Sequence, residues 1–437
     1  MNKLMPEKGI HFDPKKIDVA RAICPPYDVI NKSERKALAE LSPYNIVHVV
    51  LPEGEGDEKY RQGAVALKKM LDDKALVQDK QEGFYIYDQT FLLPDGRKVT
   101  RRGVIGRLKI QDQIEVRAHE KTLDGPKKDR FKLFLKTGVV SSQVFTIYTD
   151  PERLVEKALE SADLQAIFDV TLDDGIRHVL YRVTDKETCK SITDALKDKE
   201  LFIADGHHRF ETQCNYRNFR RKQVPTASGD EPFNFASVYA VNTSQEGLVI
   251  LSINRLFYEI QGFNPGKFKD QTTAFLNWSA PFADLDSAMD ALKKAGKTGT
   301  AFVFILKKAK PEIYVVTARH DAISEFKATG GLHPTVASLD VSFLHKKVVN
   351  DILGLDQATV TRKESIEYEH DPNEVLRLMQ EDNKYQLGVI LNPVKVDQLM
   401  AVAEAGEKMP QKSTFFFPKL FSGVVIHPLE KDVPPED

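Results

Sequence analysis

Two periodicities of hydrophobic and polar residues alternate along this chain, which predicts a mixture of helices and strands throughout. The helical spacing, with apolar residues every three or four positions, predicts helices over 32–41, 57–76, 129–137, 207–222 and 340–355. Apolar runs and period-two alternation predict strands over 42–52 (after a turn), 83–110 (a hairpin at Pro94-Asp95-Gly96), 143–149, 201–205, 234–242, 247–255, 302–319 (a second hairpin) and 385–391. The fold class that follows is α/β or α+β.

The length of 437 residues is sufficient for two or three domains with their own cores. We expect a catalytic core over 1–255 and an accessory α/β unit, containing the second hairpin, over 256–335. A C-terminal region of helices and strands over 336–437 is expected to pack back on the core.

Composition narrows the classes of partner. The formal net charge of −2 provides no global field for nucleic acid or for an anionic membrane. Cys24, Cys189 and Cys214 are far apart and form no CxxC motif, which favours a reducing compartment without a disulfide framework. The polar N-terminus lacks the apolar core of a signal peptide, and no apolar run approaches the roughly 18 residues of a membrane span. We therefore expect a soluble, cytoplasmic protein.

The stretch LFIADGHHRF, residues 201–210, contains the strongest candidate chemistry. A strand that stops at Asp205-Gly206 and restarts as a helix presents backbone N–H groups that favour an anion, and glycine allows close approach. Arg209 is suited to grip a phosphate, and His207 and His208 to donate hydrogen bonds or move a proton. Asp205 is suited to hold Mg²⁺ or to accept a hydroxyl proton. The structural alternative is that Asp205 merely caps the helix.

A second candidate is the polar loop that contains AHEKT. Here Glu120 is the best candidate for a general base toward an alcohol, Lys121 for pairing with phosphate and Thr122 for donating a hydrogen bond, beside His119. A solvated charged loop explains the same residues equally well.

Two further segments are candidates for lining a pocket. PPYDV and SPYNIVHV share a Pro-Tyr pair followed by Asp28 or Asn45, although such turns are commonly structural corners. In PQKSTFFFPKL, a lysine stands beside two hydroxyls suited to phosphate, at Lys412, Ser413 and Thr414, without the glycine loop of a Walker motif. Its phenylalanines are more typical of a core.

Several enzyme classes lack their signatures in this sequence. It contains no GxSxG, HExxH or GxGxxG motif and no context for a nucleophilic cysteine. Serine hydrolases, zincins and dinucleotide oxidoreductases are therefore poorly supported.

Seven segments together resemble a bacterial and archaeal family catalogued as domain of unknown function 1015. They run in order from residue 25 to residue 420, so the resemblance covers nearly the whole chain. The segments are PPYDVI, SPYNIVHV, HEKT, TGVVSSQVF, DDGIRHVLYRV, IADGHHR and MPQKSTFFFPKL.

The DGHHR segment also resembles the phosphate-binding corner of the ParB/sulfiredoxin-like fold, one branch of which contains free-serine kinases. This resemblance implies a ParB/sulfiredoxin-like core with additional mixed α/β regions. It maps Asp205, His207, His208 and Arg209 onto the kinase motif, and Glu120 is our choice for the separate catalytic glutamate.

The expected function is therefore that of a phosphotransferase. It would move a phosphoryl group to or from a small hydroxyl metabolite, with serine and phosphoserine as the best-supported pair, as in a serine kinase or a phosphoserine phosphatase of serine biosynthesis. Mg²⁺ on Asp205 is the expected metal, and ADP, ATP or pyrophosphate the expected phosphoryl donor or acceptor. Donor, direction and oligomeric state stay open.

Two alternatives belong to other classes. A ParB-like module bound to nucleotide or nucleic acid would use the positive charge of RNFRRK, residues 217–222, but the near-zero net charge and the lack of a clear helix-turn-helix oppose it. A non-catalytic sensor would bind a nucleotide or phosphorylated metabolite at the same corner and turn nothing over.

Overall fold

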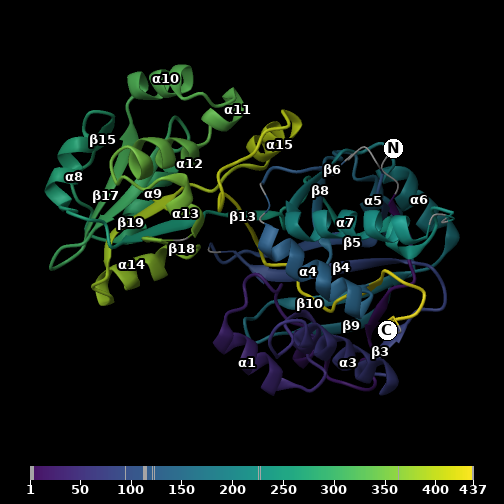
Figure 1. Ribbon diagram of the computed structural model, residues 1–437. Helices are drawn as coiled ribbons and strands as arrows, with labels where there is room; N and C mark the ends of the chain where they lie inside the picture. The colour runs from purple at the N-terminus through teal and green to yellow at the C-terminus, as the bar shows by residue number, and fades with distance from the viewer. Residues whose placement is uncertain are drawn as a thin grey trace. The chain divides into compact units, whose positions relative to one another are not determined.

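The chain folds into two compact units (Figure 1). The computed structural model describes residues 4–93, 95–111, 116–120, 122, 124–224, 226, 228–362 and 364–435. Unit 1 consists of Met1–Val249 and Pro418–Asp437, and unit 2 consists of Ile250–Phe417. The chain thus leaves unit 1, builds unit 2, and returns to complete unit 1.

This division differs from the expected one at 255 and 335. Residues 256–335 share one sheet with β18 (Ile366–Glu369) and β19 (Tyr385–Leu391), because strands from both sides of residue 335 hydrogen-bond to each other. The expected accessory unit and most of the expected C-terminal region are therefore one unit. The residues from Pro418 onward belong to the N-terminal unit.

Unit 1 is built on a mixed sheet that has nine strands among the residues described. Its order is β6-β11-β8-β12-β5-β4-β10-β9, with β1 paired to β5. The bounds are β1 (Leu4–Met5), β4 (Phe84–Leu92), β5 (Lys98–Lys109), β6 (Val116–Arg117), β8 (Val144–Tyr148), β9 (Gln165–Thr171), β10 (Arg177–Val183), β11 (Leu201–Asp205) and β12 (Phe235–Asn242).

Helices and two short ribbons complete unit 1. The ribbons pair β2 (Ile10–Phe12) with β3 (Leu76–Gln78), and β7 (Val139–Val140) with β21 (His427–Pro428). The helices are α1 (Lys32–Leu41), α2 (Val47–Val50), α3 (Glu58–Asp72), α4 (Asp124–Thr137), α5 (Leu154–Glu160), α6 (Lys186–Leu196) and α7 (His207–Gln223), with 3₁₀ turns at Val19–Arg21 and Pro232–Asn234.

The mixed α/β class is confirmed, and local chemistry explains most elements of unit 1. The β4–β5 hairpin turns at Gly96, whose φ of 83° suits glycine, while Pro94 lies outside the described residues. Asp185 caps α6 by accepting a hydrogen bond from the Thr188 N–H at 2.8 Å. Apolar side chains of β4, β5, β8, β11 and β12 pack together with those of α5 and α6 in one core cluster.

Two expected strands are wrong or divided. The segment 47–50 is helix α2, because the side chain of Asn45 accepts a hydrogen bond from the Val47 N–H and the helical turn buries its three valines. The expected strand 247–255 is split into β13 (Val249–Leu251) and the start of β14 (Asn254–Tyr258), which join different sheets.

Unit 2 has its own six-stranded sheet among the described residues, in the order β15-β17-β16-β19-β14-β18. Its remaining strands are β15 (Leu276–Trp278), β16 (Ala301–Leu306) and β17 (Glu312–Ala318), and β13 pairs separately with β20 (Phe415–Phe417). The helices are α8 (Pro265–Thr272), α9 (Leu285–Ala295), α10 (His320–Thr329), α11 (Pro334–Ala337), α12 (Asp340–Phe343), α13 (Gln357–Arg362), α14 (Pro372–Glu381) and α15 (Val396–Glu404), with a π-helix at Leu344–Asn350. Within the described ranges of both units, no helix combines the length and the apolarity required to cross a membrane.

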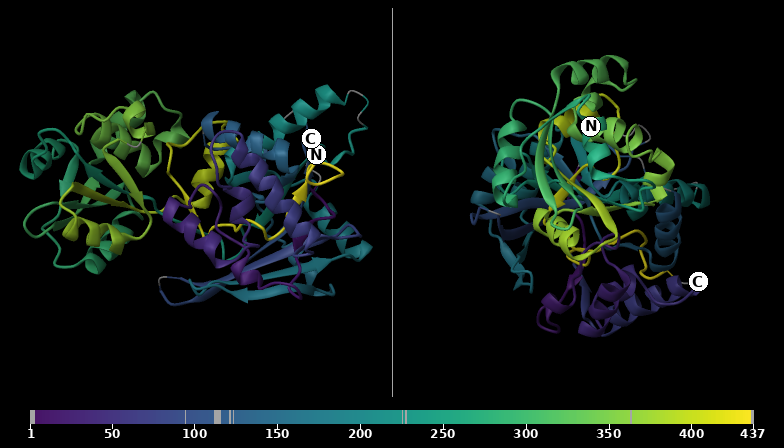
Figure 2. Two further views of the ribbon diagram at one scale, coloured as in Figure 1. Left: turned by 60° about the horizontal axis from the view of Figure 1, so that its bottom comes forward. Right: turned by 90° about the vertical axis from the view of Figure 1, so that its left-hand side faces the viewer.

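The returning segment is tied into unit 1 by backbone and side-chain contacts. Ile10 and Ile426 exchange backbone hydrogen bonds of 2.8 and 2.7 Å, and β21 pairs with β7. The carboxylate of Glu7 lies 2.5 Å from the His427 imidazole, with both side chains 2% exposed. Figure 2 shows this yellow segment running among the purple and blue elements of unit 1.

Asp129 joins three helices of unit 1. Its carboxylate accepts hydrogen bonds from Lys59 Nζ at 2.6 Å and Tyr60 Oη at 2.9 Å on α3, and from the adjacent Arg130 on α4. Arg130 in turn donates to the Val50 carbonyl at the end of α2, at 2.6 Å. Burial alone would raise the pKa of Asp129, but the Arg130 charge and these hydrogen bonds outweigh it and lower the pKa to about 2.

We predict that Asp129→Asn lowers the free energy of unfolding of unit 1 by about 1–2 kcal/mol at pH 7. A carboxyl whose pKa is depressed on folding stabilises the fold above its ordinary pKa of 3.8 and loses that contribution as the pH falls toward 2. The difference from the wild-type protein should therefore shrink between about pH 4 and pH 2. Urea unfolding followed by circular dichroism measures it.

Asp72→Asn, on the exposed face of α3, is the matched control and should change little. Trp278, the only tryptophan of the chain, lies in unit 2, so its fluorescence transition should not move. Equal stability of Asp129→Asn and Asp72→Asn would contradict the role assigned to Asp129.

Candidate functional site

Sheet topology brings the two strongest motifs to one edge. Strands β6 and β11 are parallel neighbours, with Leu201 opposite Val116 and Phe202 opposite Arg117. The AHEKT loop follows β6 and the DGHHR corner follows β11. Because parallel strands end at the same edge, His119 and Glu120 meet His207 there, as their ring and side-chain contacts show.

The corner itself depends on Gly206. This residue is the N-cap of α7 and adopts a left-handed conformation with φ of 93°. A Cβ at this position would also lie 2.8–3.0 Å from the guanidinium of Arg209. Glycine supplies no capping side chain, so the positive end of the 17-residue helix α7 faces the edge of the sheet without a side-chain cap.

The carboxylate of Asp205 is held by the side chains of Arg209 and Lys419. These three residues are called here the Asp205 clamp. Arg209 Nη2 lies 2.5 Å from Oδ2, and Lys419 Nζ lies 2.8 Å from Oδ1. Burial alone would raise the pKa of Asp205, but the Lys419 and Arg209 charges outweigh it and hold the pKa well below its usual range. The clamp therefore carries two positive charges and one negative charge at the start of α7, a net of +1.

Lys419 is positioned by buried contacts on β4 and β5. Arg101, fully buried, donates to the Pro418 carbonyl at 2.6 Å and to the Gln89 side chain. Gln89 Nε2 donates to the Lys419 carbonyl at 3.0 Å. These contacts fix the backbone of the returning segment, so the Lys419 side chain reaches Asp205.

His207 and Glu120 lie next to each other beside the clamp. The Nε2 of His207 accepts a hydrogen bond from the His119 N–H at 3.3 Å, which places the proton of the neutral ring on Nδ1. That Nδ1 lies 3.8 Å from Glu120 Oε2. His207 is 5% exposed, whereas the Glu120 side chain is 30% exposed, so the carboxylate is the member of the pair that solvent and a ligand can reach.

The rest of the AHEKT loop is bound to α7. Thr122 Oγ1 donates to Glu211 Oε2 at 2.6 Å, and Lys127 Nζ donates to the same oxygen at 3.0 Å. His119 is fully buried and its ring meets the His207 ring edge to face, with centroids 4.6 Å apart. Lys121 lies outside the described residues.

On its other side, Arg209 faces a second group of aromatic and basic residues. Arg209 is 4% exposed and also donates to the Gln143 carbonyl, so its guanidinium is largely committed within the chain. A cavity of about 20 Å³, enough for one water molecule, separates it from Tyr27, Arg130 and Ser142. The Arg130 guanidinium stacks 4.2 Å from the centre of the Tyr27 ring. Segments PPYDVI, TGVVSSQVF and IADGHHR thus meet around Arg209.

Five further predicted residues lie elsewhere in the two units. Asn45 is fully buried, and its side chain bonds the Arg21 carbonyl and the Val47 N–H, so these contacts give it a structural part in the fold while its pocket-lining role stays a prediction. Asp28 is exposed, and its neighbour Tyr27 lines the small cavity instead. The other three candidates, Lys412, Ser413 and Thr414, belong to unit 2.

The side chains do not fit a protein-bound Mg²⁺ at Asp205. Both carboxylate oxygens already contact a cationic group, and two adjacent positive charges oppose a divalent cation. Over the ranges that the structure describes, no group of three or more His, Cys, Asp and Glu side chains is arranged to hold a metal ion. The expected metal-ligating role of Asp205 is therefore corrected to that of an ion-paired anchor.

The basic segment 217–222 also bonds within the chain. Arg217 donates to the Ile110 carbonyl at 2.7 Å, Arg220 Nε lies 2.7 Å from Glu430, and Arg221 donates to Asn234 at 2.8 Å. These three arginines fasten α7 to its neighbours, and Lys222 of the same segment is exposed.

Residues that the sequence did not single out complete the cluster. Lys419 lies in the FFFPKL motif, but its use at Asp205 depends on a contact across 214 positions. Glu211 lies one helical turn after His207, so the helical period was the signal available for it, and Lys127 follows the AHEKT motif by five positions. Tyr27 stands directly beside the predicted Asp28.

Comparisons with solved structures find several distant likenesses. A conserved hypothetical protein from Pyrococcus furiosus has a TM-score of 0.34 and 13% identity, covering 73% of this chain and 92% of that one. A variant of a free serine kinase in complex with ADP has a TM-score of 0.35 and 12% identity, covering 72% and 87%. C-terminally truncated SbnI from Staphylococcus aureus has a TM-score of 0.33 and 9% identity, covering 74% and 87%.

A search of curated proteins finds no match. The model of one family, described as protein of unknown function (DUF1015), matches residues 4–342, which is most of unit 1 and more than half of unit 2. This match confirms the resemblance carried by the seven ordered segments, and the chain belongs to the DUF1015 family.

Proposed function

We propose that unit 1 transfers a phosphoryl group to or from the hydroxyl group of a small metabolite. The observation that carries this proposal is the partly exposed Glu120, paired with His207, beside a positively charged helix start with no side-chain cap. Phosphoryl transfer requires a base for the hydroxyl and fixed positive charge around the phosphate. Serine and phosphoserine are the pair that the DGHHR resemblance favours.

The phosphate would bind at the start of α7. Backbone N–H groups of the first turn and the net +1 of the Asp205 clamp favour a phosphate there. Arg209 is bonded to Asp205 and to Gln143, so we assign it to holding the corner, and we assign the phosphate contact to Lys419 and the backbone. The missing side chain of Gly206 lets the Arg209 guanidinium pack directly against the backbone of this corner.

Glu120 would handle the proton of the reacting hydroxyl. In the forward direction, the hydroxyl proton moves to the Glu120 carboxylate as the new oxygen–phosphorus bond forms and the bond to the donor's leaving oxygen breaks. In the reverse direction, Glu120 returns the proton to the departing serine oxygen. His207 Nδ1–H faces Glu120 and orients its carboxylate.

ADP, ATP and pyrophosphate are the donors or acceptors that the motif resemblance implies, and no step is assigned to a protein-bound metal. A sensor of a phosphorylated metabolite would use the same helix start without needing Glu120. Replacement of Glu120 therefore separates the two functions.

We predict that Glu120→Gln lowers the rate of phosphoryl transfer by about 10²–10⁴-fold while ligand binding persists, because only the base is lost. Phosphorus NMR would follow phosphoserine with ADP or with phosphate, and serine with ATP, ADP or pyrophosphate. The exposed Glu152→Gln in the same unit is the matched control and should keep full turnover.

A wild-type protein that turns over none of these pairs, yet is stabilised against heat by phosphoserine or a nucleotide, would replace the enzyme with the sensor. Full turnover in Glu120→Gln would show that Glu120 is not the base.

We also predict that Lys419→Met raises the KM for the phosphorylated substrate at least about tenfold, since a hydrogen bond between charged groups is worth about 1.5–3 kcal/mol and each 1.4 kcal/mol is a factor of ten. Asp205 keeps Arg209 as its partner, so the variant should stay folded. Lys197→Met, exposed after α6, is the charge-matched control. An unchanged KM in folded Lys419→Met would limit Lys419 to a structural role.

A further inference from the structure

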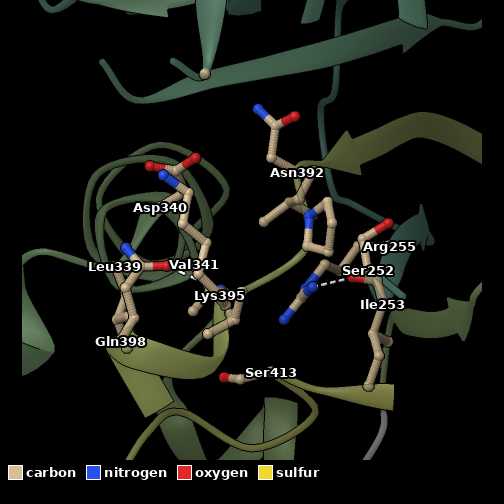
Figure 3. A pocket seen from close by; sticks show the side chains of 14 residues that line it. Ser252, Ile253, Arg255, Leu339, Asp340, Val341, Asn392, Lys395, Gln398 and Ser413 are labelled. Carbon is tan, nitrogen blue, oxygen red and sulfur yellow. Dashed lines mark hydrogen bonds between the residues drawn. The ribbon is translucent and has the colours of Figure 1, made fainter. Parts of the chain in front are cut away.

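A cavity inside unit 2 is separate from the site just described. It has a volume of about 70 Å³, enough for several water molecules or one small ligand. Its walls come from the start of β14, from α12, from the loop after β19 and from the segment before β20 (Figure 3). All of the lining residues belong to unit 2.

Arg255 is the principal charged group of this cavity. It stands on β14 and is 1% exposed, and Figure 3 shows its guanidinium directed into the pocket. Its hydrogen-bond partners are the carbonyls of Ile253 and Lys412 (2.9 Å for the latter) and Nε2 of His345 at 3.5 Å. Its Nε is buried without a hydrogen-bond partner.

The charge of Arg255 is not balanced inside the unit. Among the described residues, no carboxylate lies within 4 Å of its guanidinium, and burial lowers the pKa of Arg255 to about 10. His345 stays neutral, because burial and Arg255 lower its pKa to about 3. A buried guanidinium with neutral partners is costly unless an anion compensates it.

The other charged groups that line the cavity do not balance the positive charge of Arg255. Asp340 on α12 is mostly buried, which raises its pKa to about 6, and it accepts hydrogen bonds from Thr300 and the Ala301 N–H. Lys395 is the positive group that acts on Asp340, and both line the cavity. Asp340 and Lys395 offset each other, so Arg255 supplies the net positive charge.

We propose that this cavity is a binding site for a small oxyanion, a phosphate or a carboxylate group, with Arg255 as its main ligand and Lys395 at its rim. The site is independent of the phosphoryl-transfer site in unit 1. Its occupant would meet the two stretches through which the chain enters and leaves unit 2, because Ser252 and Ser413 both line the cavity.

Arg255 already joins these two stretches through the Ile253 and Lys412 carbonyls. A bound anion would neutralise the guanidinium and strengthen this junction. The expected consequence is a more stable unit 2 in the presence of the anion.

Trp278 makes the test specific, because the only tryptophan of the chain lies on β15 of unit 2. The full-length protein is heated at constant ionic strength with increasing inorganic phosphate, or with increasing acetate, while tryptophan fluorescence is followed. We predict a saturable rise of the Trp278 transition temperature with at least one of the two probes. Saturation by phosphate alone identifies a phosphorylated ligand, and saturation by acetate alone identifies a carboxylate.

The variants separate this site from general salt effects. Arg255→Gln should abolish the saturable rise, and Lys395→Met should weaken apparent affinity at least fivefold. Lys327→Met, an exposed lysine of α10 outside the cavity, removes the same charge and should behave as wild type. If Arg255→Gln does not fold, the apparent anion affinities of Lys395→Met and Lys327→Met are compared, and a weaker affinity in Lys395→Met alone supports the proposed site.

No saturable rise with either probe would overturn the proposal, and so would equal rises in wild type, Lys395→Met and Lys327→Met. Glu120→Gln should leave the Trp278 response unchanged. Failure of this site and failure of the proposed phosphoryl transfer are thus observed independently.

Discussion

The ion pairing of Asp205 with Arg209 and Lys419 is the interaction on which the rest of the candidate site depends. A carboxylate at a largely buried strand end requires compensating charge, and removal of either cation would leave part of that charge unbalanced. Arg209 comes from the first turn of α7, and Lys419 arrives only after the chain has passed through all of unit 2. The corner is therefore complete only when the returning segment has docked, so it depends on both of the separated parts of the sequence that form unit 1.

The spacing of apolar residues correctly predicted helices and strands that bury one face or their whole surface. Strand β11, helix α7 and strand β19 lie where the spacing of apolar residues placed them. The pattern failed at residues 47–50. Three valines and a histidine favour a strand there locally, whereas the Asn45 side chain accepts a hydrogen bond from the Val47 N–H at the start of a helical turn. A tertiary setting that buries Val47, Val49 and Val50 overrides that preference.

The local chemistry of the site was also readable, but its long-range partners were not. An aspartate, a glycine and two histidines at a strand end point to an anion site by their own properties, and the Asp205–Arg209 pair has the i,i+4 spacing that allows contact. The sequence could not indicate that this contact occupies Arg209 and leaves Asp205 unsuited to Mg²⁺. That result depends on Lys419, whose position is set by Arg101 and Gln89 on two other strands.

The segment from residue 412 to residue 419 links the two positively charged centres through the chain itself. At one end, the Lys412 carbonyl accepts a hydrogen bond from Arg255 in unit 2, and at the other end the Lys419 ammonium binds Asp205 in unit 1. Both centres carry a local excess of positive charge in a protein whose net charge is −2, so the excess results from placement and not from composition. Only six residues, 413–418, lie between the two anchors, so one short stretch of chain is held at both of its ends.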